Sequence, residues 1–257
     1  NANVLCLTLI DEVRTRFPGE VTLASVHGGG MDNAIARTAE ATLFCSSEAA
    51  AFLHTRAASY QKTFCTADRC GTITIQKQEE MPATVLRETD TEALLQLVRT
   101  LPNGVICRSR DFEGLVDVSA NLGICHADGT NICCSSSLRA MKKQDMEAQK
   151  DRFVQIARES GFTLSFRGEY PGWEYHPDSA LCQLYVETYR DFYGADPVVE
   201  TIHAGLECGI FCNKIPGLDA ISFGPTMQHV HTPDERLSVS SVKRVWNHLC
   251  VMLAKML

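Results

Sequence analysis

The chain has 257 residues, of which 45% are hydrophobic and 21% are charged, so it holds enough apolar material for one large domain or two medium ones. Its net charge is −7, from 24 basic and 31 acidic residues, and no basic tract alternates with aromatic residues, which argues against a nucleic-acid-binding protein. The apolar runs are much shorter than the ~18 residues that a membrane-spanning helix needs, so no membrane protein is expected either.

The first predicted element is a helix that begins with the chain itself. Apolar residues recur at helical spacing over 3–17, and Pro18 with Gly19 then ends the pattern. Neither an initiator methionine nor a signal-peptide pattern precedes this helix. A helix with nothing in front of it suggests a fragment of a longer protein.

The elements that follow predict an α+β arrangement with an antiparallel sheet. In chain order we expect a strand at 21–26, a glycine-rich turn at 27–30, a strand at 41–46, a helix at 47–62 and a strand at 71–77. This is the order of a ferredoxin-like sandwich without its first strand. The pattern partly recurs as a helix at 92–101, strands at 104–110, 115–125 and 131–139, a helix at 143–160 and a strand at 162–168.

A change in composition predicts a domain boundary near residue 168. The segment GEYPGWEYHPD, at 168–178, is rich in proline, glycine and aromatic residues. Beyond it helices alternate with strands, as in an α/β sheet: a helix at 179–193, a strand at 198–203, a helix at 206–214, a strand at 220–223 and a closing helix. Two strands are too few for a stable sheet, so we expect the rest of it outside this sequence.

The closing helix has an apolar pattern from which its core face is predicted. The residues expected on that face are Val242, Val245, Trp246, Leu249 and Leu253.

Twelve cysteines are scattered along the chain, several of them inside strand-like runs such as ATLFCS and NICCSSS. A chain of this size does not need disulfides, so we interpret them as reduced cysteines that pack as small apolar residues in a reducing cytoplasm. Cys65 and Cys70 form a weak metal-binding signal, because no second pair stands at zinc-ribbon spacing.

The strongest candidate site is the loop ISFGPTMQHVHTPDERLSV, at 221–239, which follows a predicted strand. Ligands bind beyond the carboxyl ends of strands in α/β sheets, and imidazole is a common zinc ligand. His229 and His231 point to the same side only if the segment is extended, so one ligand and one bystander is as plausible as two ligands. Asp234 and Glu235 would then support an imidazole or cap the last helix. The alternative to a functional site is that both histidines are solvated loop residues beside a helix cap.

A second candidate is TIHAGLECG, at 201–209, where Gly205 and Gly209 allow the backbone to approach a ligand closely. His203 and Glu207 would face the cleft. The alternatives are a buried core histidine and a carboxylate at a helix N-terminus. Cys208 is also a possible nucleophile, but a catalytic cysteine needs an oriented histidine partner, which the sequence does not show.

Two further candidates lie in the first part of the chain. In HGGGMDNAIAR, at 27–37, the glycines require a special turn, and Asn33 can both donate and accept hydrogen bonds; the alternative is a plain hairpin-like loop. Arg139, in CCSSSLRAM, ends an otherwise uncharged strand and suits a carboxylate; the alternative is a surface arginine.

Several of these segments together resemble one family. IHAGLECGIF, LDAISFGPTMQHVHTPDERLSV, GGGMDNAIAR and RGEYPGWEYHPDSALCQLYVETY are similar to segments of the aminoacyl-histidine dipeptidases, also called Xaa-His dipeptidases, which include bacterial carnosinases. This family belongs to the dinuclear zinc peptidases related to aminoacylases and carboxypeptidases. The resemblance covers essentially the whole chain.

The resemblance implies a fold of class α/β. It implies an α+β lid domain with a ferredoxin-like antiparallel sheet at 1–168, lacking its first strand, that mediates dimerisation. It also implies that 169–257 is the C-terminal part of an α/β zinc-peptidase catalytic domain.

The resemblance also implies roles for individual residues. His231 matches the final ligand of a site for two Zn²⁺ ions, whereas His229 matches no ligand position. Glu207 and Gly209 match the loop that lies against substrate, and Asn33 and Arg139 match lid positions that hold the peptide. His203, which we expect to face the same cleft, is included among the substrate-binding residues. The catalytic general base and the other metal ligands belong upstream of this chain in the family.

The implied function is metal-dependent hydrolysis of Xaa-His dipeptides such as carnosine, by a cytoplasmic homodimer that binds small peptides. This chain would be an incomplete and inactive part of that enzyme, because three protein ligands are the usual minimum for catalytic zinc. Two alternatives stay open: a non-enzymatic dimerisation module of lid type, and a related aminoacylase or tripeptidase.

Overall fold

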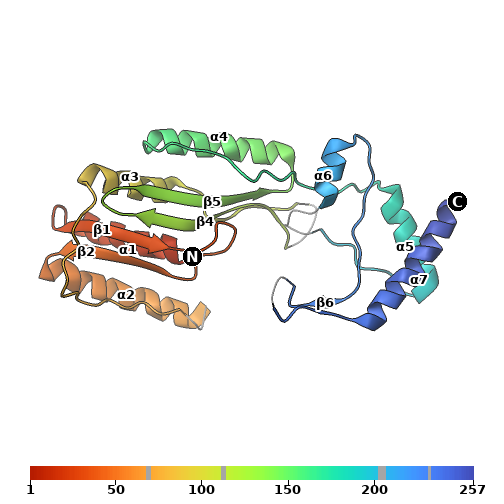
Figure 1. The fold of residues 1–257 in the computed structure, drawn as a ribbon, viewed down its shortest axis with the longest axis horizontal. Coiled ribbons are helices and arrows are strands. Elements are labelled where there is room, and N and C mark those ends of the chain that lie inside the picture. Colours follow the sequence, from red (N-terminus) through yellow and green to blue (C-terminus); the bar gives the residue numbers. More distant parts are fainter. Residues whose placement is uncertain (68–70, 111–113, 202–206, 231–232) are drawn as a thin grey trace. The chain divides into compact units, whose positions relative to one another are not determined.

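The computed structural model describes residues 1–67, 71–110, 114–201, 207–230 and 233–257 (Figure 1). The contacts between residues divide the chain into two compact units. The first contains Asn1–Ala140 and Gln144–Phe166, and the second contains Met141–Lys143 and Arg167–Leu257. The sequence predicted a boundary near residue 168, and the chain passes from the first unit to the second between Phe166 and Arg167. The roles proposed for the two units rest on the family resemblance.

Among its described residues, the first unit has four helices, each wholly or mostly within it, and five strands. Its elements are α1 (Ala2–Arg16), β1 (Val21–Gly28), β2 (Ala39–Cys45), α2 (Ser47–Ala67), α3 (Glu88–Thr100), β3 (Gly104–Arg108), β4 (Val116–Ala127), β5 (Ile132–Ala140) and α4 (Lys143–Glu159). The side chain of Asn1 accepts a hydrogen bond from the amide of Val4 and caps α1. The predicted mixture of helices and antiparallel sheet is confirmed.

β4 is the longest strand and the centre of the sheet. It pairs along its length with β5, whereas on its other side β1 pairs with 125–127 and β3 with 116–120 (Figure 1). β2 pairs with β1, so the sheet has five strands. The loop after β1 runs beside the middle of β4, where the side chain of Asn121 donates to the carbonyl oxygen of Ala34 at 2.8 Å.

The main core of the first unit lies where α1 and α3 pack on the sheet. Its fully buried side chains come from α1, β1, α3 and β4, and include Leu7, Ile10, Leu23, Val26, Leu94, Leu95 and Leu122. A smaller cluster of Val13, Val21 and Ala49 joins α1 to the start of α2. Each fully buried Leu, Ile or Val side chain stabilises the fold by about 1.5–3 kcal/mol relative to an exposed one.

Two strands predicted in the first unit are wrong, at 71–77 and at 162–168, because the structure assigns no strand to either segment. In the first segment, the side chain of Gln61 on α2 forms hydrogen bonds with two backbone groups. Its Oε1 accepts from the amide of Ile73 at 2.7 Å, and its Nε2 donates to the carbonyl oxygen of Gly71. The second segment is mostly exposed. An alternating pattern makes a strand only when another strand pairs with it.

The second unit is mainly helical. Its elements are α5 (Ala180–Tyr193), α6 (Glu207–Lys214), β6 (Met227–Gln228), β7 (Arg236–Leu237) and α7 (Val239–Met256). The predicted strands at 198–203 and 220–223 are wrong where the structure describes them, since 198–201 and 220–223 have no regular structure. Within the described residues, no neighbouring strand offers them a ladder of hydrogen bonds.

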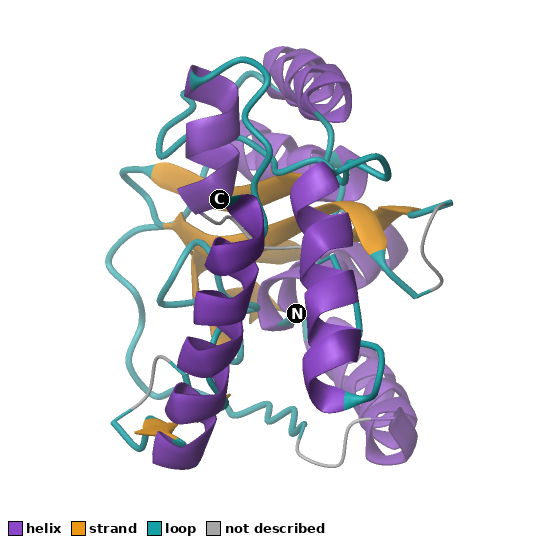
Figure 2. Cartoon of the chain, turned by 90° about the vertical axis from the view of Figure 1, so that its right-hand side faces the viewer, coloured by secondary structure: helices purple, strands orange, loops and turns teal. Residues whose placement is uncertain are grey.

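α5 and α7 lie side by side (Figure 2) and bury His248 between them. The Nε2 atom of His248 lies 2.9 Å from Oγ1 of Thr188, and burial lowers the pKa of the imidazole. Its ring is surrounded by aromatic rings, those of Tyr185, Tyr189, Phe192, Tyr193 and Phe223. α5 itself is capped by Ser179, whose hydroxyl accepts from the amide of Cys182.

The core face predicted for the closing helix is confirmed only in part, since Val245 and Leu249 are half-buried but Val242 is exposed. α7 buries Ser241, His248 and Met252, whereas Trp246 is 63% exposed and Leu253 is 51% exposed. The side that α5 covers includes the polar residues Ser241 and His248, so the apolar pattern of the sequence did not indicate it. Among the described helices none combines the length and apolar character required to cross a membrane.

Candidate functional site

The loop at 221–239 forms a short hairpin attached to the start of α7. Met227 pairs with Leu237 and Gln228 with Arg236, and of the described residues His229, Val230 and 233–235 lie between the paired segments. The amide of Ser238 donates to the carbonyl oxygen of Thr226 at 2.9 Å, which ties the hairpin to the first turn of the helix. His229 has a φ of 54°, the left-handed region that costs a residue with a side chain about 1–2 kcal/mol.

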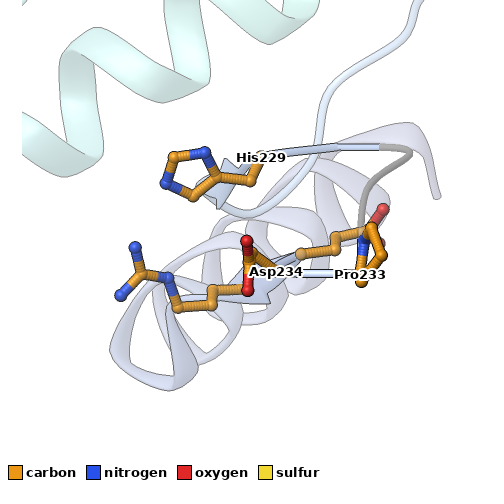
Figure 3. Close-up of a pocket in the computed structure, with 5 residues that line it drawn as sticks. His229, Pro233 and Asp234 are labelled. Atoms are coloured by element: carbon orange, nitrogen blue, oxygen red, sulfur yellow. The ribbon is translucent and has the colours of Figure 1, made fainter.

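The hairpin lines an open pocket of about 390 Å³. Its lining residues are His229, Pro233, Asp234, Glu235 and Arg236, all of them exposed. His229 lies on the outgoing arm of the turn, and Pro233 and Asp234 lie on the returning arm (Figure 3). One imidazole, two carboxylates and one guanidinium therefore share a small, polar and solvent-accessible site.

The sequence did not single out Arg236 as a site residue, although it belongs to the same HTPDER segment. His231, the predicted metal ligand, lies outside the described residues, as does Thr232. Within the described ranges, no three His, Cys, Asp or Glu side chains come close enough to hold a metal ion. These side chains alone therefore do not fit a centre for two zinc ions, in which each ion needs three or more protein ligands.

Glu207 and Gly209 lie at the beginning of α6. Glu207 is the first residue of the helix and is exposed, a position where a carboxylate interacts favourably with the helix dipole. Gly209 is buried, and a Cβ there would lie 2.8 Å from the carbonyl oxygen of Pro171 and 3.2 Å from that of Gly172. Gly209 thus allows α6 to pack directly on the backbone of the proline-glycine segment.

Cys208 follows Glu207 in the first turn of α6. His203 and Gly205 lie outside the described residues. Cys208 is half-buried, and burial raises the pKa of its thiol. A nucleophilic cysteine needs a lowered pKa, so this environment disfavours the cysteine nucleophile that the sequence left open.

Asn33 is exposed on the loop that runs beside the middle of β4. Three hydrogen bonds anchor this loop: the amide of Ala2 donates to Ala36 and that of Gly29 to Thr38, and the side chain of Asn121 donates to Ala34. The special turn predicted from the glycines is present. Gly29 has a φ of +73°, and a Cβ on it would lie 1.7 Å from a carbonyl oxygen of β4.

Arg139 is exposed near the end of β5, opposite Ser119 of β4. Two residues earlier Ser137 pairs with Asn121, the residue that binds the Asn33 loop. The loop and Arg139 therefore lie along the same stretch of the β4–β5 ladder in the first unit. Glu207, Gly209 and His229 belong to the second unit.

Comparison with known proteins gives two informative relatives, and no family model matches the chain. The cytosol non-specific dipeptidase of Escherichia coli (strain K12) is 28% identical over 239 residues, which cover 91% of this chain and 49% of the relative. The crystal structure of aminoacylhistidine dipeptidase from Vibrio alginolyticus is 28% identical and superposes with a TM-score of 0.88, covering 100% of this chain and 52% of that one.

The chain thus spans about half the length of the relatives it matches. The resemblance read from its motifs agrees with both comparisons, since each relative is named as a dipeptidase and one of them as an aminoacylhistidine dipeptidase. In sequence the chain is similar to part of a cytosol non-specific dipeptidase, and in sequence and fold it is similar to part of an aminoacylhistidine dipeptidase.

Proposed function

We propose that the chain is part of a longer, metal-dependent dipeptidase that hydrolyses Xaa-His dipeptides such as carnosine. The observation that carries the proposal is the match to the aminoacylhistidine dipeptidase of Vibrio alginolyticus, which covers the whole of this chain at a TM-score of 0.88. The sequence relative from Escherichia coli is also a dipeptidase, which supports hydrolysis of peptides in general.

The two units have different roles in this proposal. Residues 1–168 form a lid and dimerisation domain, and 169–257 form the C-terminal part of the catalytic domain. His231 supplies one ligand to a pair of Zn²⁺ ions, and the remainder of the longer protein supplies the other ligands and the general base. Metal ions in such enzymes make water a stronger nucleophile and polarise the peptide carbonyl.

The proposed substrate-binding residues are described separately for each unit. In the first unit Asn33 offers an exposed amide and Arg139 an exposed guanidinium along one stretch of the sheet. A dipeptide has a free carboxylate, which a guanidinium binds with two parallel hydrogen bonds. In the second unit His203, Glu207 and Gly209 belong to the segment that would lie against the substrate.

An open apolar surface supports the view that the second unit needs more protein around it. Trp246 and Leu253 of α7 are exposed on the side away from α5, and Val198 and Val239 are 83% and 81% exposed. Isolated exposed apolar residues are ordinary, but a continuous apolar helix face usually covers another element. We propose that the remainder of the catalytic domain packs on this face and pairs with the segments around 198 and 220.

The proposed protein is a cytoplasmic homodimer, and the chain by itself has no peptidase activity. The test compares the chain with a longer protein that includes the other half of the relatives' length. Release of histidine from carnosine is measured in the presence of Zn²⁺, and zinc binding is measured by calorimetry. We expect turnover by the longer protein only, and no tight stoichiometric zinc on the chain. Robust turnover by the chain would contradict its incompleteness.

A second candidate is a dipeptidase of broad specificity, which the name of the Escherichia coli relative favours. Activity of the longer protein on dipeptides without histidine, at rates comparable with carnosine, would select this candidate. Preference for N-acyl amino acids or tripeptides would instead point to a related aminoacylase or tripeptidase. A longer protein that dimerises but hydrolyses none of these would support a non-enzymatic dimerisation module.

A further inference from the structure

A row of polar side chains crosses the sheet of the first unit near one end of β4. His27 of β1 pairs with Glu40 of β2 on one side and with His126 of β4 on the other, and His126 pairs with Cys133 of β5. Side chains of residues directly opposite in antiparallel strands lie on the same face of the sheet. This row of four therefore shares one face.

The row lies on the face turned away from the core. Val26, Cys125 and Ala127, which alternate with the two histidines along β1 and β4, are fully buried. The side chain of His126 is 42% exposed, so solvent and small ions reach it. Two imidazoles thus meet on an accessible, rigid part of the sheet.

The two rings are arranged as two ligands of one ion would be. Nδ1 of His27 lies 2.8 Å from Nδ1 of His126, and the ring centroids are 4.4 Å apart with the planes tilted by 57°. A straight N–H···N bond of this length would place the centroids about 5.1 Å apart, because each ring then lies directly behind its nitrogen. The shorter observed distance between the centroids shows that the contact is bent at the nitrogens, as it is when two imidazoles bind one ion.

A metal ion with ligands at right angles accounts for both distances. Two nitrogens bound at about 2.0 Å and at 90° around one ion lie about 2.8 Å apart, with ring centroids about 4.5 Å apart. In a tetrahedral site the same bonds would separate the nitrogens by about 3.3 Å. The pair is therefore better matched to square-planar or octahedral ions, such as Cu²⁺ and Ni²⁺, than to tetrahedral Zn²⁺.

Asp128 favours the tautomer of His126 that can bind a metal ion through Nδ1. Its Oδ2 lies 3.2 Å from Nε2 of His126, and its Oδ1 accepts hydrogen bonds from the amides of Thr130 and Asn131 and from the hydroxyl of Thr130. When Nε2 of His126 donates to this fixed carboxylate, the neutral ring carries its lone pair on Nδ1. Metal-binding histidines commonly have such a carboxylate behind them.

We propose that His27 and His126 form a binding site for a divalent transition-metal ion that prefers right-angled coordination. Without metal, Nδ1 of His27 donates to Nδ1 of His126; with metal, His27 carries its proton on Nε2 and both Nδ1 atoms bind the ion. Since no third ligand is within reach among the described residues, water fills the remaining positions. Glu40 and Cys133 flank the pair in the strand register.

Titration of the chain with Ni²⁺, followed by calorimetry, tests this site, because Ni²⁺ does not oxidise the many thiols of the chain. The variants are His27→Gln and His126→Gln, separately and together, with circular dichroism as the check of folding. His54→Gln is the matched control, since His54 is exposed on α2. His229→Gln is a second control that removes a histidine from the hairpin pocket.

The expected result is one bound Ni²⁺, held more tightly than Zn²⁺, with affinity at least tenfold lower in either single variant. The double variant should show no specific Ni²⁺ binding, because both imidazole ligands of the one ion are removed. Asp128→Asn should weaken binding by about tenfold. The controls should bind as the unchanged chain does. No bound Ni²⁺, or binding that survives in the folded double variant, would overturn the proposal.

Discussion

Gly29 is the residue at which the backbone most clearly demands a glycine. Its φ of +73° lies in the left-handed region, and a Cβ on it would lie 1.7 Å from the carbonyl oxygen of Gly123. The run of three glycines in the sequence predicted a special turn. It did not predict which glycine is constrained, because the opposing residue is far away along the chain and only the strand register brings the two together.

The change Gly29→Ala should therefore lower the free energy of unfolding by at least about 2 kcal/mol, from the left-handed backbone together with the overlap. Urea unfolding of the chain measures this loss. Gly30→Ala is the control, because a Cβ there meets no atom within 4 Å, and its effect should stay within about 0.5 kcal/mol. Equal effects of the two substitutions would show that the turn is not constrained as described.

The helices illustrate how far elements can be predicted from sequence. α1 and α5 were expected nearly where they occur, because apolar periodicity and capping residues are local signals. The strands at 71–77, 162–168 and 220–223 were predicted wrongly, since a strand exists only through its neighbours. The buried side of α7 was predicted only in part, because it includes the polar residues Ser241 and His248, which an apolar pattern does not indicate.

His248, on the buried side of α7, should make the stability of the chain depend on pH. Burial lowers the pKa of its imidazole in the folded state, so the unfolded state takes up the proton first as the pH falls. The stabilisation is complete above the unfolded pKa of about 6.5 and decreases as the pH falls below it.

The measurement is the free energy of unfolding in urea at pH 7.5, 6.5 and 5.5, for the chain and for His248→Gln. The glutamine amide can still donate to Oγ1 of Thr188 but does not titrate. We expect the chain to lose more stability than the variant between pH 7.5 and 5.5. Parallel pH profiles would show that His248 is protonated equally easily in the folded and unfolded states.

At the scale of the whole molecule, the sequence was most informative where motifs resemble those of a family. Those motifs predicted the fold class and the dipeptidase relatives. They did not predict the His27–His126 pair, because two histidines 99 residues apart meet only through strand register. The roles assigned to His231 and His203 stay predictions, since both lie outside the described residues.

The substitution Trp246→Glu tests whether the exposed apolar face of α7 is covered in a longer protein. Because its side chain is 63% exposed, Trp246→Glu should change the free energy of unfolding of this chain by no more than about 0.5 kcal/mol. In the longer protein the same substitution would bury a charge, so it should destabilise by several kcal/mol. Urea unfolding of both proteins makes the comparison. A small effect in the longer protein would mean that this face stays exposed.

The release of histidine from carnosine by the longer protein tests the central claim most directly. With Zn²⁺ present we expect turnover by the unchanged protein, a loss of more than about a hundredfold in His231→Ala, and little change in the control His54→Ala. Loss in the first variant alone would support the zinc-dependent dipeptidase. Absence of dipeptide hydrolysis, or full activity of His231→Ala, would contradict it.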